Sequence, residues 1–461
     1  MSNKFEIISP IDGAVFAERA YANNKEIEVC LSDAELSQTT WSRTTLEERA
    51  DICTNLVNYF LDHKNEIAEE ITCQMGRPIL YAPLEISKGL EERATYMIQE
   101  AFNSLSDINF TNESGFERYI QREALGVVLV LAPWNYPYLT AINSVIPAIM
   151  AGNTVILKHA EQTALCAERF YKAFEYAGLP KGVFQYLHVT HEQVRNIILD
   201  RRIAYVAFTG SVEGGAAIKE AVGQRFISVG LELGGKDPAY VRRDADIKDT
   251  VDNLVDGAFF NSGQSCCGIE RIYVHQDIFK EFTDQFVEIT RGYLLDNPLN
   301  RQTTLGPMVR VNSAQKADRQ IKDAVKKGAS VLIGPDDFPQ LEYPYFPPQI
   351  LINVDHSMKV MTEESFAPIV GIMSVDNDEE AIQLMNDSRY GLTASVWTSD
   401  LKIARSIGQQ IQTGTFYMNR CDYLDPALAW TGVKDSGLGC SLSSLGYHHL
   451  TRPKSFHMRK I

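Results

Sequence analysis

The fold of this chain is decided by an apolar run and the rigid turn after it, Val127-Val128-Leu129-Val130-Leu131-Ala132-Pro133-Trp134-Asn135-Tyr136-Pro137. Consecutive β-branched and leucine side chains indicate a strand that is buried on both faces. Similar runs return downstream, separated by stretches with helical spacing, and we expect strands at 154–158, 184–189, 203–209 and 226–232. This alternation predicts an α/β fold, with a parallel sheet covered by helices on both faces.

A second alternating set follows residue 236, and we interpret it as a second α/β domain. Its expected elements are helices near 277–290 and 311–327 and strands at 330–333, 394–397 and 414–419. Upstream, residues 45–104 have the periodicity of helices. Residues 1–40 contain short apolar segments that are interrupted by turns. The segment 455–459 is typical of an edge strand that pairs with another subunit.

The overall composition is that of an ordinary globular protein, with 461 residues, 45% of them hydrophobic and 22% charged. The net charge of −15 argues against a nucleic-acid partner. The sequence has no apolar signal core and no credible membrane span, so we expect no membrane partner. The eight cysteines are mostly scattered singly and lack metal-binding spacing, which favours a reducing cytoplasmic location and no metal.

Two adjacent thiols, Cys266 and Cys267, stand among small and polar residues in the segment 259–268. Gly263 lets backbone approach closely, because it has no Cβ. A nucleophilic cysteine needs partial exposure and nearby dipoles that lower its pKa. Because a helix is expected over 246–260 and a strand over 269–275, the thiols should lie in a tight connection, with one of them opening a short helix. The alternative is a pair of small buried hydrophobic residues.

Two further residues follow predicted strands and could take part in chemistry. Glu232 is a lone acid among leucines and glycines, and desolvation would raise its pKa toward that of a general base. Asn135 lies in a turn between two prolines that could aim its amide at a developing oxyanion. The alternatives are an acid satisfied by backbone N–H groups and a turn that only packs.

Three other places could hold a nucleotide. Gly210, Ser211 and Gly215 lie between a strand and a helix, where glycines let a pyrophosphate approach the helix N-terminus; the alternative is a simple helix cap. Lys158 and Glu161 could bind a ribose or form a surface ion pair. Glu364 and Phe366 could bind a second ribose and a flat ring, or form a solvated acidic turn.

Taken together and in this order, these motifs resemble the aldehyde dehydrogenase superfamily, of the NAD(P)-dependent, non-acylating type. The most specific motifs are Glu232-Leu233-Gly234-Gly235-Lys236 and Asn261-x-Gly263-Gln264-x-Cys266, and the resemblance runs from about Ser9 to Met458. Ala367 departs from the family, which usually has glycine there.

The resemblance implies a Rossmann-like NAD-binding domain at 1–113 and 127–235 and an α/β catalytic domain at 236–435. A small β oligomerisation element at 114–126 and 448–461 would join subunits into a homodimer or homotetramer. The implied partner is a small-molecule aldehyde, oxidised to its carboxylic acid.

The resemblance also implies the role of each site residue. Cys266 would be the nucleophile that forms a thiohemiacetal and then a thioester, Glu232 the general base for hydrolysis, and Asn135 the oxyanion donor. The cofactor would be NAD, with NADP also acceptable. Its expected contacts are Trp134, Lys158, Glu161, Gly210, Ser211, Gly215, Leu233, Glu364 and Phe366.

The substrate is poorly specified by the sequence. An aromatic-lined tunnel for an apolar aldehyde could be formed by Tyr136, Tyr138, Tyr423 and Trp430, although core packing is an equal alternative. Thr140 and Asn143 could instead favour a small polar aldehyde, and the motif regions contain no arginine cluster for a substrate carboxylate. Two other classes remain open: a coenzyme A-acylating or reductive, aldehyde-forming enzyme, and a non-catalytic structural or binding protein.

Overall fold

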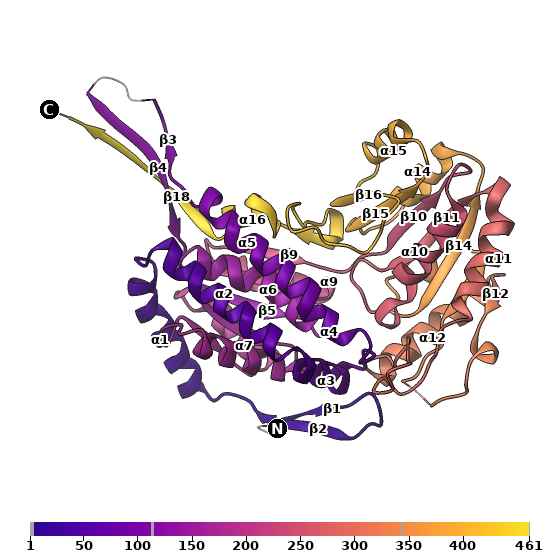
Figure 1. Ribbon diagram of the computed structural model, residues 1–461, viewed down its shortest axis with the longest axis horizontal. Helices are drawn as coiled ribbons and strands as arrows, with labels where there is room; N and C mark the ends of the chain where they lie inside the picture. The colour runs from indigo at the N-terminus through magenta and orange to yellow at the C-terminus, as the bar shows by residue number, and fades with distance from the viewer. Residues whose placement is uncertain (1–3, 112–114, 343, 461) are drawn as a thin grey trace.

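The computed structural model describes residues 4–111, 115–342 and 344–460, which form two α/β lobes and a projecting three-stranded sheet (Figure 1). The first lobe is built on a six-stranded sheet of order β17-β9-β8-β5-β6-β7. Its parallel strands are β5 Val127–Ala132, β6 Thr154–His159, β7 Phe184–Tyr186, β8 Ile203–Thr209 and β9 Ser228–Glu232. The strands predicted between 127 and 232 are therefore confirmed, with β7 shorter than expected.

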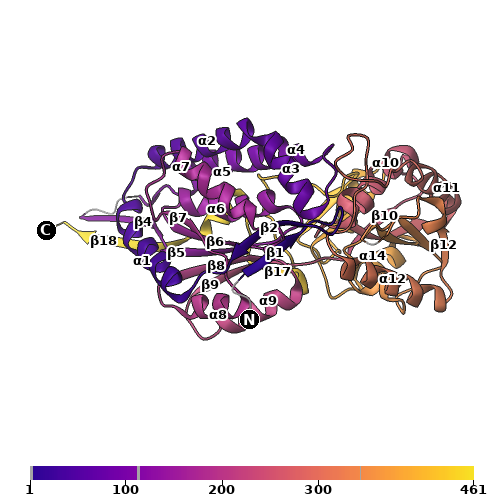
Figure 2. The ribbon, with the colours of Figure 1, turned by 90° about the horizontal axis from the view of Figure 1, so that it is seen from below.

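Strand β5 is buried on both faces of the sheet, which explains its uninterrupted apolar sequence. Val128 and Val130 pack into one core cluster, whereas Val127, Leu129 and Leu131 pack into another on the opposite face. Successive side chains of a strand point to opposite faces, so both faces of the sheet are covered. Figure 2 shows two layers of helices, one on each side of the sheet. The layer above it contains α2 Leu46–Asp62, α5 Glu91–Ser104, α6 Pro137–Met150 and α7 Leu165–Tyr176. The layer below it contains α8 His191–Leu199 and α9 Val212–Val222.

The second lobe is a seven-stranded sheet of order β12-β13-β14-β11-β10-β15-β16, parallel except for β12. Its strands are β10 Asp237–Val241, β11 Ile269–His275, β12 Ser330–Ile333, β13 Gln349–Ile352, β14 Ile369–Val375, β15 Thr393–Trp397 and β16 Thr415–Met418. Its helices are α10 Ile247–Phe259, α11 Phe279–Thr290, α12 Val311–Lys326, α13 Lys359–Thr362, α14 Asp378–Asn386 and α15 Leu401–Gly408. The predicted second set of strands and helices is present.

The third sheet has the order β18-β4-β3, and β18 Thr451–Arg459 pairs antiparallel with β4 Phe116–Ala124 along its whole length. The strand expected at 455–459 is confirmed and lies at an edge. The sheet also includes β3 Ile108–Asn109, which the predicted boundaries assigned to the first lobe. Residues 112–114 and 461 of the predicted ranges lie outside the described residues.

The chain returns to the first lobe between the second and third sheets. There β17 Gly437–Leu438 pairs antiparallel with β9, and α16 Ser443–His448 contacts α5. This return was not predicted, and it brings residues after 435 against the end of β9. Of the helices that the structure describes, none combines the length and apolarity needed to cross a membrane.

The region before residue 41 differs from the prediction. A hairpin of β1 Lys4–Ile8 and β2 Val15–Ala20 leads into an 18-residue helix, α1 Asn24–Trp41. The helix buries only Cys30, Leu31, Ala34 and Trp41, so its apolar stripe is narrow. The segment 45–104 is helical as predicted, through α2, α3 Lys64–Met75, α4 Ala82–Leu84, the π-helical turn Glu85–Leu90 and α5.

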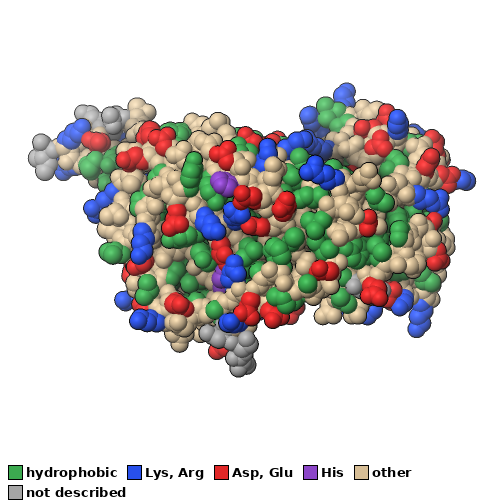
Figure 3. Space-filling view, turned by 60° about the horizontal axis from the view of Figure 1, so that its bottom comes forward, with side chains coloured by type: hydrophobic (Ala, Val, Ile, Leu, Met, Phe, Trp, Pro, Cys, Tyr) green, Lys and Arg blue, Asp and Glu red, His purple; other side chains and the backbone are tan. Residues whose placement is uncertain are grey.

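Acidic and basic side chains both occur on the face drawn in Figure 3.

Candidate active site

The thiol pair lies in a turn between α10 and β11, and Cys266 lines a cavity to which residues of both lobes contribute. Helix α10 ends at Phe259, and the next turn contains Asn261, Ser262 and Gly263, with φ values of 53°, 56° and 67°. A Cβ on Gly263 would stand 2.2 Å from the carbonyl oxygen of Ala367, so the close backbone approach expected of this glycine is confirmed. Neither thiol opens a helix, which corrects that prediction, because the chain passes directly from the turn into β11.

Side-chain amides hold this turn in place. Asn261 Nδ2 donates to the carbonyl oxygens of Gln264 and Asn135 at 3.2 and 3.3 Å. Gln264 Nε2 donates back to the Asn261 carbonyl at 3.1 Å, and Gln264 Oε1 accepts from Val309 N at 2.8 Å. Both polar side chains thus shape the backbone that presents Cys266.

Asn135 is 4% exposed and points at the same turn, where its Nδ2 donates to the Gln264 carbonyl at 3.1 Å. The backbone carbonyl of Asn135 accepts a hydrogen bond from the buried Arg77, which also forms an ion pair with Glu85. Glu85 Oε1 in turn accepts from the N–H groups of Tyr138 and Leu139 at 2.8 and 3.0 Å, capping the start of α6. Arg77 and Glu85 were not predicted from the sequence, since neither lies in a recognisable motif.

A cavity of about 160 Å³ brings most of the predicted site together at the carboxyl ends of β5, β8 and β9. It is lined by Pro133, Trp134, Asn135, Thr209, Gly210, Ser211, Glu232, Leu233, Gly234, Cys266, Glu364 and Phe366. The rings of Trp134 and Phe366 meet edge-to-face with centroids 5.5 Å apart. Nine residues named from the sequence therefore line one cavity.

The glycine-rich turn after β8 forms a helix cap, which was one of its two predicted interpretations, while pyrophosphate binding stays a prediction. Ser211 is the N-cap of α9, and its Oγ accepts from Gly214 N at 3.1 Å. Gly215 does not line the cavity. It allows close packing instead, because a Cβ there would stand 2.6 Å from the side chain of Leu233.

Lys158 and Glu161 lie at the end of β6 and just after it, and neither lines the cavity. Among the described residues no ion pair within 4 Å joins them, so the predicted surface ion pair is absent. Burial lowers the pKa of Lys158, and Glu161 partly offsets this. Glu161 Oε1 accepts a hydrogen bond of 2.6 Å from the hydroxyl of Tyr21, which sequence analysis did not single out.

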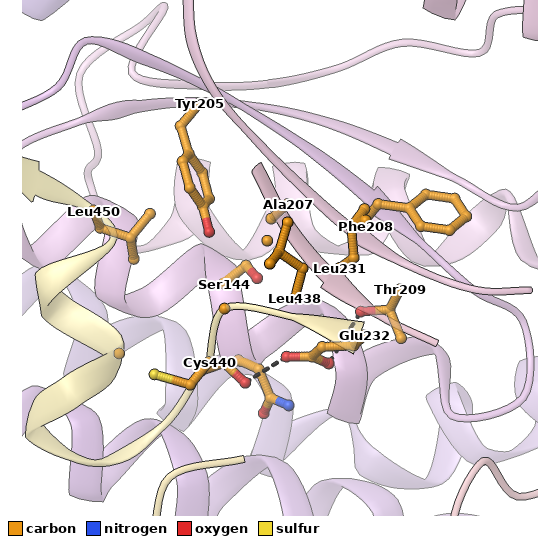
Figure 4. A pocket seen from close by; sticks show the side chains of 15 residues that line it. Ser144, Tyr205, Ala207, Phe208, Thr209, Leu231, Glu232, Leu438, Cys440 and Leu450 are labelled. Atoms are coloured by element: carbon orange, nitrogen blue, oxygen red, sulfur yellow. Dashed lines mark hydrogen bonds between the residues drawn. The ribbon is translucent and has the colours of Figure 1, made fainter. Parts of the chain in front are cut away.

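Glu232 ends β9, and hydroxyl groups hold both of its carboxylate oxygens (Figure 4). Oε1 accepts from Ser441 Oγ, and Oε2 accepts from Thr209 Oγ1 at 3.1 Å. The prediction of backbone N–H partners was therefore wrong. Burial raises the pKa of Glu232, while the two hydroxyls and the more distant Arg93 oppose the rise.

A second cavity of about 30 Å³ shares Thr209 and Glu232 with the first and does not include Cys266. Ser144, Tyr205, Cys440 and Ser441 are among its lining residues (Figure 4). Glu232 thus separates a larger cavity that contains the thiol from a smaller one that has room for about one water molecule.

The two thiols have different surroundings. Cys266 is partly exposed and lines the larger cavity, whereas Cys267 is 2% exposed. Cys267 Sγ donates to Asp422 Oδ1 at 2.9 Å, and Ser265 Oγ donates to the same oxygen at 3.1 Å. The hydrogen bond with Cys266 and burial raise the pKa of Cys267, and burial raises the pKa of Asp422 to about 6.

Two of the four aromatic residues proposed for a substrate tunnel are core residues. Tyr138 is fully buried between Phe60 and Phe170, and Trp430 is 4% exposed in the same cluster. The burial of Tyr138 agrees with the alternative of core packing, and a tunnel role for the four residues stays a prediction. Tyr136 stacks against Arg77 at 4.5 Å, and Tyr423 donates to Glu92 at 2.6 Å.

Comparisons with known proteins agree with this geometry. The model of the aldehyde dehydrogenase family matches residues 1–456. An aldehyde dehydrogenase of Paenarthrobacter nicotinovorans is 34% identical over 97% of this chain and 98% of its own length. The succinate semialdehyde dehydrogenase [NAD(P)+] Sad of Escherichia coli K12 is 32% identical over 96% of this chain and 95% of its own.

Solved structures give the same result. The succinic semialdehyde dehydrogenase of Streptococcus pyogenes, in complex with NADP+, superposes with a TM-score of 0.94 at 28% identity, covering 99% of this chain and 100% of its own. An NAD-dependent aldehyde dehydrogenase of Sinorhizobium meliloti has a TM-score of 0.95 at 28% identity, covering 99% and 91% of the two chains.

Proposed function

Because the chain belongs to the aldehyde dehydrogenase family, we propose that Cys266 is its nucleophile, Glu232 its general base and Asn135 its oxyanion donor. The reaction is the NAD(P)-dependent oxidation of an aldehyde to its carboxylic acid through a cysteine thiohemiacetal. One observation carries the assignment of residues: these three side chains come from separate segments and line the same cavity.

In the first step the Cys266 thiolate attacks the aldehyde carbonyl, a C–S bond forms, and the carbonyl oxygen becomes an oxyanion. The donors available to it are the Asn135 amide and the backbone N–H of Cys266. One N–H of the Asn135 amide is engaged by the Gln264 carbonyl, which orients the group and leaves its second N–H for the oxyanion.

The residues around the cavity fit a nicotinamide cofactor. Ser211 caps α9 and leaves helix N-terminal amides for a pyrophosphate, and the Trp134 and Phe366 rings offer a surface for a flat ring. A Cβ on Gly234 would stand 2.2 Å from Glu364 Oε1, so a larger residue there would displace the Glu364 carboxylate from its present position. A nicotinamide held by these residues would supply the hydride acceptor that oxidation of the thiohemiacetal to a thioester requires.

Glu232 acts in the last step. It accepts a proton from a water molecule whose oxygen attacks the thioester carbonyl, the C–S bond breaks, and the Cys266 thiolate and the carboxylic acid are released. Ser441 and Thr209 hold the carboxylate at the cavity wall until then. A coenzyme A-dependent outcome is disfavoured, because a thiol acceptor needs no base that activates water.

We further propose that NAD is preferred over NADP and that subunits associate through the exposed edge of β18. The Tyr21 hydroxyl fixes the Glu161 carboxylate near the end of β6, where it can accept from both hydroxyls of a ribose. A 2′-phosphate would remove one donor and add negative charge beside this acid.

The direct test of the proposed chemistry is to trap the acyl-enzyme with an aldehyde and NAD, and to locate the adduct by mass spectrometry. The adduct is expected on Cys266. An adduct on Cys267, or no NADH formation across a broad aldehyde panel, would refute the assignment.

A further inference from the structure

Arg77 is a buried arginine that contacts both the proposed oxyanion donor and the turn that carries the thiols. It follows Gly76, the residue that ends α3, and it is 2% exposed. Its Nη2 donates to the backbone carbonyl of Asn135, and its Nε donates to Asn261 Oδ1 at 3.1 Å. The chemistry described above assigns no role to this side chain.

These contacts join segments from both lobes. Arg77 and Asn135 belong to the first lobe, whereas Asn261 lies between α10 and β11 of the second. Asn261 Nδ2 donates to the carbonyl oxygens of Asn135 and Gln264 at 3.3 and 3.2 Å. Asn135 Nδ2 donates to the same Gln264 carbonyl at 3.1 Å. Hydrogen bonds therefore run in a closed set through Arg77, Asn135 and the turn, and they fix Asn135 relative to the backbone that leads into Cys266.

The guanidinium of Arg77 is held in one orientation by its other neighbours. Its Nη1 donates to the carboxylate of the buried Glu85. The ring of Tyr136 lies against it, with the Arg77 Cζ 4.5 Å from the ring centroid. Because a guanidinium is planar and its N–H groups point in fixed directions, it can hold a carboxylate, a backbone carbonyl and an amide oxygen at once. A lysine has all its donors on one nitrogen and cannot reach these three acceptors together.

The place of the Asn135 amide matters for the reaction, because an oxyanion donor must already be in position when negative charge develops. Removal of one such donor typically lowers kcat about 10²- to 10³-fold. A displacement of about 1 Å can cost about 10²-fold. Asn135 lies beyond the end of β5, and the donors to its carbonyl are the side chains of Arg77 and Asn261. Its position therefore depends on side-chain contacts.

We propose that Arg77 is a positioning residue, which sets the Asn135 amide against the Cys266 sulfur by holding the Asn135 carbonyl and Asn261 together. This inference rests on the proposed function of Asn135 and Cys266. Arg77 is not among the residues that line the cavity containing the thiol, so it acts through Asn135 and does not touch the substrate.

A double-mutant cycle tests whether Arg77 acts through Asn135. We expect kcat to fall about 10²- to 10³-fold in Asn135→Ala and about 10- to 100-fold in Arg77→Met. The double variant should be at most about threefold slower than Asn135→Ala, because a donor that is absent cannot be misplaced. If the two falls multiply instead, the inference is wrong while the role of Asn135 stands. A native kcat in Asn135→Ala would refute both.

The matched control is Arg49→Met. Arg49 is another buried arginine of the first lobe, 8% exposed, and it donates to backbone carbonyls at the ends of α1 and α6. Its substitution should lower stability and leave kcat close to the native value. Arg77→Lys keeps the charge beside Glu85 without the planar fork, and its kcat should lie between those of Arg77→Met and the native protein. If Arg77→Met does not fold, the cycle is measured with Glu85→Gln added, which removes both charges of the buried pair.

A second measurement separates positioning of Asn135 from a general loss of structure. Iodoacetamide alkylates a thiolate by displacing iodide, and no oxyanion forms in that reaction. The alkylation rate of Cys266, followed by mass spectrometry, should therefore stay close to native in Arg77→Met, while kcat falls about 10- to 100-fold. Equal falls in the two rates would overturn the inference, because they would mean that Arg77 supports the thiol or the whole fold and not the oxyanion donor.

Discussion

The hydroxyl of Ser441 donates a hydrogen bond to the carboxylate of Glu232, although 209 positions separate the two residues in the chain. The contact exists because β17 pairs with β9 and returns the chain to the first lobe. Together with Thr209 it holds the proposed general base at the wall between the two cavities.

Removing this hydroxyl should lower the fraction of Glu232 that is ionised, and so able to act as a base, at neutral pH. The Ser441 hydrogen bond lowers the pKa of Glu232 against the effect of burial, so Ser441→Ala should raise that pKa and move the acidic limb of the kcat profile to higher pH. We expect kcat at pH 7 to fall up to about tenfold, with recovery toward pH 9.

The pH profile of steady-state kcat, under conditions where deacylation limits the rate, measures this effect. Ser144→Ala is the matched control: it removes a hydroxyl from the same small cavity without touching Glu232, and its profile should equal the native one. Identical profiles for Ser441→Ala and the native protein would contradict the role of the contact.

The two thiols should respond differently to the same substitution. Cys266→Ala should reduce turnover below about a thousandth of the native value, as loss of a nucleophile does. Cys267→Ala should keep most of its turnover and lose about 1–2 kcal/mol of stability, because it breaks the buried hydrogen bond to Asp422. Steady-state kinetics and urea unfolding of both variants test this, and equal losses of activity would refute it.

Glu232→Gln keeps the shape of the side chain but cannot accept a proton. Loss of base catalysis should slow deacylation about 10²- to 10⁴-fold. Hydride transfer should survive, so rapid mixing should show a burst of NADH followed by slow turnover. Native steady-state turnover in this variant would exclude Glu232 as the base.

Cofactor choice should depend on Glu161. We expect a preference for NAD of about 1.5–3 kcal/mol, or roughly 10- to 150-fold in kcat/KM. Glu161→Ser should reduce this ratio by raising relative use of NADP, and Tyr21→Phe, which removes only the hydroxyl that positions the acid, should have a smaller effect. Equal efficiency of the two cofactors in the native protein would contradict the proposal.

Glu364 should make stability depend on pH. Burial and the nearby Glu270 raise its pKa to about 7 in the folded protein. A carboxyl with a raised folded pKa contributes stability that is fully present below its unfolded pKa, near 4.5, and is lost as pH rises through about 7. The contribution is at most about 3 kcal/mol.

Urea unfolding at pH 5 and at pH 8 measures this contribution. The free energy of unfolding should fall between these pH values more steeply in the native protein than in Glu364→Gln. The exposed neighbour provides the control Glu363→Gln, which should behave as the native protein does. The same slope in all three proteins would rule out a titrating Glu364.

Periodicity predicted the parallel strands of the first sheet, because they are largely buried and mostly apolar, as β5 is. It missed β10, β13 and β14 of the second sheet. It failed at α1, whose four buried residues are outnumbered by polar ones. The local signal for that helix is its capping box, formed by the N-cap Asn23 and by Glu26 in the first turn.

The proposed site residues were predictable where they lie in local motifs, as Cys266, Glu232 and Asn135 do. Ser441 and Arg77 could not be found this way. Each makes contacts between segments far apart in the chain, and neither is part of a local pattern. Tyr138 shows the opposite case. It was predicted to line a substrate tunnel because it follows a motif, but its side chain is buried in the core.

Because Ser441 is translated long after Glu232, their hydrogen bond has a consequence for biosynthesis. At typical rates of about 5–20 residues per second, a ribosome that has just translated Glu232 needs roughly 10–40 s to add the 209 residues that lead to Ser441. Throughout that interval the nascent first lobe can form its parallel strands, but the hydroxyl that holds its proposed base has not yet been made.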